Sequence, residues 1–422
     1  MQTLTEKQLS TGRRMYILQA ALEYLIAIAV GGSFLATLTK EIGMSDSLTG
    51  IITSITSLGG LFQLLALFVR TRKIKRFVIG VSILNQLLFI ALYFVPGLAM
   101  GREISGAVFA FIIVSANLLY NLASPHKSSW MMSMVDPRQR GIFSAHKEMF
   151  SLLLGMGFSF GMGWLFDHME AQGKLYTAFA IMVVAMVVCM LLAAMTMLLT
   201  AENPALQKKE RKPLLPTIKT LLGDRRMRMV FGLHMLYTLF NNVAVPFYGT
   251  YQLVELNFSL TLISSFGILS SVARMIVSPR WGKYADRHSF VHMVEKALLV
   301  LGASFLCVAL ANPANGLVMF ALYYLLHGIA MGGANSAMFN IIFEYAPQQE
   351  QSNALAICNA LSGVAGFLTT VVMSLVVTAV QQGGNQVLGA TIYAQQILSL
   401  VSVLGILGTV VYLRRFFPRE KR

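Results

Sequence analysis

The chain has 422 residues, of which 56% are hydrophobic and only 12% are charged. A soluble domain carries about a quarter charged residues, so this composition excludes an ordinary soluble protein. The formal net charge of +15 would suit a nucleic-acid-binding protein, but its distribution along the chain, described below, has another explanation.

The amino-terminal residues 1–15 are polar and basic, and an apolar stretch of full membrane-spanning length follows them. We therefore expect a first transmembrane helix there, not a cleaved signal peptide. The three cysteines, Cys189, Cys307 and Cys358, lie inside apolar stretches. This placement indicates neither a disulfide framework nor a metal site, and no cofactor is expected.

Twelve segments of the chain are long and apolar enough to cross a bilayer, which requires about 20 residues in a helix. They are 16–38, 47–69, 77–98, 105–126, 146–166, 174–199, 229–250, 259–278, 291–311, 316–339, 354–380 and 390–413. The sequence therefore predicts an all-α membrane protein with twelve transmembrane helices.

One long polar stretch, 200–228, separates the sixth segment from the seventh and is rich in Lys and Arg. We interpret it as a cytoplasmic linker between six-helix bundles at 1–199 and 229–422. A shift of about half the chain lays Arg70 on Arg280, and loop 136–139 on loop 346–349. Such a weak internal repeat is typical of transporters built from two related bundles.

The basic residues lie almost entirely on one side of the predicted bundle. If the amino terminus is cytoplasmic, all but five of the 33 Lys and Arg lie in cytoplasmic segments. Lys40, Arg102 and Lys174 fall on the opposite side, and Lys127 and Arg274 lie at or within spans. By the positive-inside rule, both termini are predicted to be cytoplasmic. Membrane topology thus explains the net charge, and no nucleic-acid partner is expected.

Two motifs carry a family resemblance. After Pro279, a short basic turn holds Gly282, Asp286 and Arg287 in the spacing G-x-x-x-D-R, which resembles a loop motif of major facilitator transporters. The tenth segment contains His327-Gly328 and Gly332-Gly333, similar to the family's arginine-glycine signature but with histidine in place of arginine. The resemblance covers essentially the whole chain.

The resemblance implies the family's fold, two pseudo-symmetric six-helix bundles that work by alternating access as a monomer. It also implies that Asp286 caps a neighbouring helix and pairs with arginine to hold the cytoplasmic side shut. The predicted gating residues are Arg274, Gly282, Asp286 and Arg287. The corresponding loop of the first half, FVRTRKIKRFV, lacks the glycine and the aspartate.

Glu23 is the acidic residue deep in the first predicted span. An ionisable group inside a membrane span is costly and is therefore a functional candidate. Glu23 could take up and release a proton, as first-span acids do in many symporters and antiporters of the family. The structural alternatives are a neutral carboxylic acid hydrogen-bonded to a neighbouring helix, or a carboxylate near enough to the cytoplasmic end to stay solvated.

Polar side chains form stripes on three predicted spans at helical spacing. The predicted substrate-binding residues are Asn117, Tyr120, Asn121, His234, Tyr237, Asn241, Tyr248, Tyr324, His327 and Asn335. In the family's fold, the first, fourth, seventh and tenth spans line a central cavity, so these stripes would face one another. The alternative is hydrogen bonding between helices, which is common in bundles.

The resulting prediction is a secondary active transporter of the cytoplasmic membrane, driven by protons or sodium. Amide, aromatic and imidazole groups suit a polar, largely uncharged solute such as a sugar. The alternative is proton-coupled efflux of lipophilic or cationic drugs, which the absence of the drug-antiporter proline from the fifth span, GMGFSFGMG, disfavours. A membrane enzyme is not expected, because the chain has no Walker A or HExxH motif. A channel is not expected either, because the sequence shows no selectivity filter or re-entrant segment.

Overall fold

The computed structural model describes residues 4–65, 73–98, 100–135, 140–202, 214–347, 350–387 and 390–417. Its first helices are α1 (Glu6–Ala29), α2 (Gly32–Glu41), α3 (Asp46–Ser54), the 3₁₀-helix η1 (Ile55–Leu58), α4 (Gly59–Leu65), α5 (Ile74–Ala91), the 3₁₀-helix η2 (Leu92–Leu98), α6 (Arg102–Met132), α7 (Arg140–Ala171) and α8 (Leu175–Leu199).

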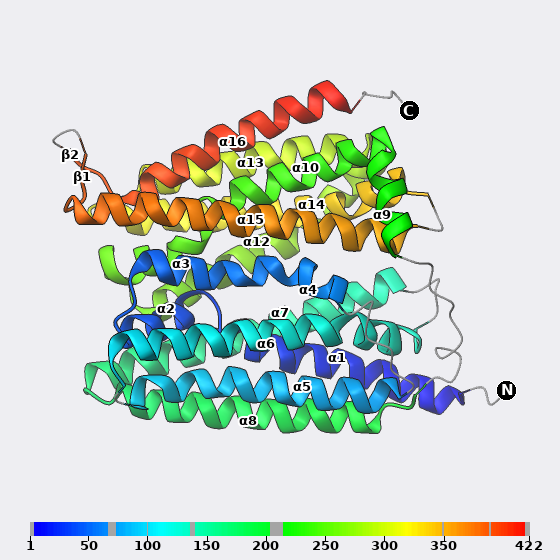
Figure 1. The fold of residues 1–422 in the computed structure, drawn as a ribbon, viewed down its shortest axis with the longest axis horizontal. Coiled ribbons are helices and arrows are strands. Elements are labelled where there is room, and N and C mark those ends of the chain that lie inside the picture. The colour runs from blue at the N-terminus through cyan, green and yellow to red at the C-terminus, as the bar shows by residue number, and fades with distance from the viewer. Residues whose placement is uncertain are drawn as a thin grey trace. The chain divides into compact units, whose positions relative to one another are not determined.

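The rest of the described chain contains α9 (Leu214–Gly223), α10 (Arg225–Asn242), η5 (Val245–Phe247), α11 (Tyr248–Thr250), η6 (Tyr251–Glu255), α12 (Leu260–Arg287), α13 (Phe290–Ala309), α14 (Gly316–Tyr345), α15 (Gln351–Gln382), β1 (Gln386–Val387), β2 (Ala390–Thr391) and α16 (Ala394–Phe416). The two strands pair antiparallel as a short hairpin before α16. The architecture is all-helical apart from that hairpin (Figure 1).

Eleven described helical segments are long and apolar enough to span a membrane. The predicted second span is not among them, because it is divided into α3, η1 and α4, and residues 66–72 lie outside the described chain. The structure thus confirms an all-helical membrane protein with eleven of the twelve predicted spans as candidates among the described residues.

Several predicted boundaries were wrong. The first span is interrupted between α1 and α2, where Gly32 adopts a φ of 51°, a value that glycine reaches without steric cost. The seventh breaks after Asn242 into short helices that include Pro246. The predicted turn after Pro279 is helical, since α12 continues to Arg287. The predicted linker contains the helix α9.

Contacts divide the chain into two compact units. Unit one comprises Met1–Met44, Phe62–Arg211 and Ser259–Ser264, and unit two comprises Ser45–Leu61, Lys212–Phe258 and Ser265–Arg422. Segment 45–61 belongs to unit two because α3 and η1 pack tightly on α15. A Cβ on Gly363 of α15 would lie 1.9 Å from the carbonyl oxygen of Ser57.

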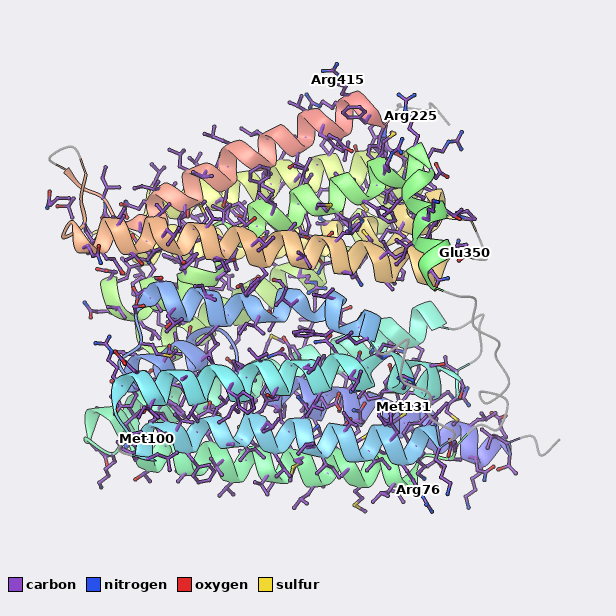
Figure 2. All side chains as sticks on the ribbon, viewed as in Figure 1. Arg76, Met100, Met131, Arg225, Glu350 and Arg415 are labelled. Atoms are coloured by element: carbon purple, nitrogen blue, oxygen red, sulfur yellow. The ribbon has the colours of Figure 1, made fainter. Side chains whose placement is uncertain are left out.

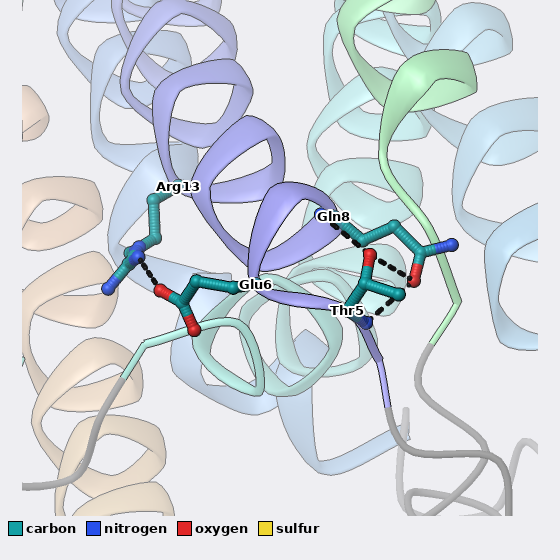
Figure 3. Close-up of polar contacts among 4 residues, drawn as sticks. All are labelled: Thr5, Glu6, Gln8 and Arg13. Atoms are coloured by element: carbon teal, nitrogen blue, oxygen red, sulfur yellow. Dashed lines mark hydrogen bonds and ion pairs between the residues drawn. The ribbon is translucent and has the colours of Figure 1, made fainter.

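In unit one, α1 packs against α7 and α8, and α5 against α6 and α8 (Figure 1). The start of α1 is held by a capping box. The Thr5 hydroxyl accepts a hydrogen bond from the backbone N–H of Gln8 at 3.3 Å, and the side-chain oxygen of Gln8 accepts one from the backbone N–H of Thr5 at 2.9 Å (Figure 3). An apolar cluster around Trp130, Met131 and Met134 fills one end of the unit.

Figure 2 shows where six labelled side chains lie within the two units. Arg76 and Met131 lie toward one end of unit one, and Met100 lies at the other. In unit two, Arg225, Glu350 and Arg415 lie toward a common end.

In unit one, Asp167 of α7 caps the beginning of α12. Its carboxylate accepts hydrogen bonds from the Leu260 amide at 2.9 Å, from the Thr261 amide at 2.8 Å and from the Thr261 hydroxyl. Ser159 and Gly163 lie on the same face of α7, where Ser159 bonds Ser264 at 3.1 Å. A carboxylate here satisfies amides that have no partner within the helix and interacts favourably with the helix dipole.

Replacing Asp167 by alanine is expected to lower the free energy of unfolding by about 1–2 kcal/mol, because it removes this cap. Thermal unfolding of the purified protein measures the change. Glu170→Ala is the matched control, since Glu170 is exposed one turn further along α7. Equal stability of the two variants would contradict a capping role for Asp167.

Candidate functional site

Glu23 forms a buried ion pair with Lys127. Glu23 is on α1 and Lys127 on α6, and the Lys127 ammonium donates a short hydrogen bond to the Glu23 carboxylate. The two side chains are only 15% and 9% exposed. The structure thus brings the predicted coupling residue together with a cation that the sequence analysis did not select.

An aromatic ring contacts this pair, and a buried amide side chain lies one turn before Glu23 on α1. The Lys127 ammonium lies 5.3 Å from the centre of the Tyr120 ring, a cation–π contact. Gln19, one turn before Glu23, is fully buried, and neither polar atom of its side chain has a partner among the described residues. We call Gln19, Glu23, Tyr120 and Lys127 the unit-one cluster. Its groups can bind a polar ligand or a proton.

Asn117 and Asn121 use their amides within their own helix. The Asn117 side chain donates to the Ile113 carbonyl at 2.8 Å, and that of Asn121 to the Asn117 carbonyl at 2.9 Å. Asn121 also accepts from Gln63 at 3.4 Å. Both residues are buried, so these contacts agree with the alternative of structural hydrogen bonding.

Three predicted residues of α10 occupy one stretch of unit two. His234 contacts the Met338 carbonyl at 3.1 Å, and the Tyr237 hydroxyl donates to the sulfur of Met331 at 3.6 Å. The side-chain oxygen of Asn241 is buried without a partner among the described residues. His234 and Tyr237 thus face α14, where His327 also lies.

Tyr248 does not continue the face of α10, because the helix breaks after Asn242. Its hydroxyl instead bonds Ser399 of α16 at 2.8 Å. Tyr324 bonds Gln252 at 3.2 Å and stacks on Phe266. Asn335 is exposed on α14. Because α10 ends at Asn242, the prediction that His234, Tyr237, Asn241 and Tyr248 share one continuous helical face was wrong.

Close packing of α12 on α14 places Arg274 beside the histidine of the glycine signature. A Cβ on Gly328 would lie 2.2 Å from the Ser270 carbonyl oxygen, and one on Gly332 would lie 3.2 Å from that of Arg274. Arg274 interacts electrostatically with the Tyr237 hydroxyl and with the His327 ring. We call Tyr237, Arg274 and His327 the unit-two cluster.

The remaining predicted gating residues lie on the last turns of α12. Gly282 and Arg287 are exposed there, and the side chain of Asp286 lies outside the described part of the structure. Arg274 lies about three turns before Asp286 on the same helix.

Lys127 and Tyr323 were not among the predicted site residues. Lys127 meets the criterion that selected Glu23, a charge at or within a span. Tyr323 is buried and contacts His327 with ring centres 5.3 Å apart. The i, i+4 spacing of Tyr323 and His327 was the available signal. No group of three or more potential metal ligands occurs within the described ranges.

The family model "Major Facilitator Superfamily" matches residues 16–370 and 230–422. No curated protein matches the sequence. Among solved structures, a D-xylose–proton symporter is similar with a TM-score of 0.73 at 15% identity, covering 97% of this chain and 98% of that one.

Two other solved structures have similar scores. The nucleoside transporter NupG gives a TM-score of 0.69 at 12% identity and covers 98% of this chain and 100% of its own. The POT family transporter PepTSo gives 0.72 at 11% identity, with coverage of 98% and 99%. At these identities the likeness shows the fold alone. The family match establishes that this chain belongs to the Major Facilitator Superfamily and is a multi-pass secondary transporter, not an enzyme.

Proposed function

We propose that this transporter moves a small polar organic solute, such as a sugar or related metabolite, coupled to protons through Glu23. The observation that carries the proposal is the buried Glu23–Lys127 ion pair. A proton on Glu23 would remove one charge of the pair and leave the Lys127 ammonium without its carboxylate. Proton binding would thus change both the charge and the contacts of the unit-one cluster.

The substrate-binding role is proposed for the predicted polar residues that lie near one another in unit two, chiefly His234, Tyr237 and His327. Hydroxyl, imidazole and aromatic groups hydrogen-bond and stack on a hydroxylated ring. Efflux of cationic drugs is less well supported, because the Glu23 carboxylate already pairs with a lysine. A cationic drug would have to displace that lysine.

The same proposal includes the membrane and the topology. All but five of the 33 Lys and Arg lie in segments on one side of the predicted bundle, which supports a location in the cytoplasmic membrane with both termini inside. We further propose that the chain acts as a monomer, that its halves divide at the basic linker 200–228, and that Gly282, Asp286 and Arg287 form a cytoplasmic gate.

The test is Glu23→Gln in proteoliposomes, with a labelled solute chosen by thermal-shift screening of sugars, amino acids and organic acids. The variant is expected to lose accumulation driven by an imposed pH gradient but to keep solute exchange, because a neutral amide cannot carry a proton. Glu6→Gln is the matched control on α1, since Glu6 is 83% exposed. Accumulation by Glu23→Gln at the wild-type level, or dependence on sodium alone, would refute proton coupling through Glu23.

A further inference from the structure

We infer that the transported solute carries an oxyanion, a carboxylate or a phosphate group, and that Arg274 of the unit-two cluster binds it. This inference rests on the proposed function and narrows its substrate class. It assigns to Arg274 a role in recognition in place of the gating role predicted from its sequence position.

The position of Arg274 is the first argument. It lies well inside the candidate span Leu260–Ala285, far from either end. Arginine at the centre of a membrane helix is energetically costly, and such residues mark substrate or ion pathways.

The neighbours of Arg274 are the second argument. The small residues Gly328 and Gly332 bring the Arg274 backbone against α14, next to His327. The Tyr237 side chain reaches the same stretch of α14, where its hydroxyl lies 3.6 Å from the Met331 sulfur. Arg274 interacts electrostatically with both Tyr237 and His327. Three helices thus contribute hydrogen-bond donors to one region of unit two.

The chemistry of these donors favours an oxyanion. A guanidinium has five N–H donors in a planar fork, so it can keep a bond within the helix bundle and still bind two oxygens of a ligand. The phenol and an imidazole N–H can donate to the same ligand. The side-chain oxygen of Asn241, one turn after Tyr237, accepts no hydrogen bond from the part of the chain that the structure describes, so it is available to accept from a ligand hydroxyl. A sugar acid or a sugar phosphate carries both kinds of group.

The experiment compares matched solutes on the purified full-length protein. Glucose, glucuronate and glucose 6-phosphate differ in having no oxyanion, a carboxylate or a phosphate, and glycerol, glycerate and glycerol 3-phosphate form a second set. Dose-dependent thermal stabilisation measures apparent affinity for wild type, Arg274→Gln and Arg274→Lys. Arg280→Gln is the control for loss of positive charge, since Arg280 is exposed on α12 and bonds its own helix at 3.1 Å.

An anionic member of a set is expected to stabilise the wild type and Arg280→Gln, while its neutral parent does not. Arg274→Gln should weaken that binding about 30-fold or more, and Arg274→Lys should weaken it less because it keeps the charge but loses the fork. Preference between glucuronate and glucose 6-phosphate identifies the oxyanion.

Stabilisation by the neutral parents alone, equal in wild type and Arg274→Gln, would overturn the inference, as would failure of every anion at millimolar concentration. Neither result bears on proton coupling through Glu23, because the Glu23→Gln flux measurement tests that claim separately. Conversely, anion binding that depends on Arg274 in a protein whose accumulation ignores Glu23 would retain the substrate class and refute the coupling residue.

Discussion

Replacing Lys127 by alanine is expected to lower the free energy of unfolding by about 3–5 kcal/mol, because the variant leaves the Glu23 carboxylate buried without its cation. The pair is almost entirely shielded from water, so solvent screening reduces this cost little. The same change is expected to abolish gradient-driven accumulation, since proton binding at Glu23 would no longer alter an ion pair. Thermal unfolding and proteoliposome flux measure the two effects.

A double variant separates the missing charge from general damage to the fold. Lys127→Ala combined with Glu23→Gln removes both charges, and we expect it to recover most of the lost stability while remaining inactive in accumulation. If the two single changes are additive in the double variant, the ion pair contributes no coupling energy and its proposed role is wrong. Lys40→Ala is a matched control, because Lys40 is an exposed lysine of unit one.

The fold could be predicted from the sequence because the number and length of apolar segments are direct consequences of the bilayer's thickness. The interruptions could not. An apolar run shows no difference between a straight helix and one that bends at Gly32 or breaks after Asn242. The helical continuation of α12 through Pro279 also went against the usual reading of proline as a helix end.

The candidate site was predictable only in part. Polar residues inside spans were the signal that selected the candidates, and the structure brings Tyr237 and His327 near Arg274. Partner choice was not predictable, because the residues that pair are distant in sequence. Glu23 and Lys127 are separated by more than a hundred positions. A lysine near the end of a predicted span is explained by the positive-inside rule alone, so its role in an ion pair is recognised only when the opposing helix is known.

The glycine pattern of α14 has a physical explanation that the sequence motif alone did not supply. Gly328, Gly332 and Gly333 all face α12, and a Cβ on Gly333 would lie 2.9 Å from the Trp281 ring. Trp281 in turn donates from its indole nitrogen to the Ile329 carbonyl at 2.9 Å. Small residues let membrane helices approach closely enough for such contacts. That approach also sets the distance between Arg274 and His327.

Replacing Gly328 by alanine is therefore expected to cost about 1–3 kcal/mol of stability and to weaken solute binding, because the new Cβ would meet backbone at 2.2 Å. Backbone cannot rotate away as a side chain can, so α12 and α14 must separate, and Arg274 would move from His327. Gly267→Ala on α12 is the matched control, since a Cβ there has nothing within 4 Å. It should leave stability unchanged or raise it by up to about 1 kcal/mol through helix propensity. Thermal unfolding without and with the solute measures the change in stability and the change in solute binding. Equal stability and affinity of the two variants would mean that close packing of α12 on α14 does not position the unit-two cluster.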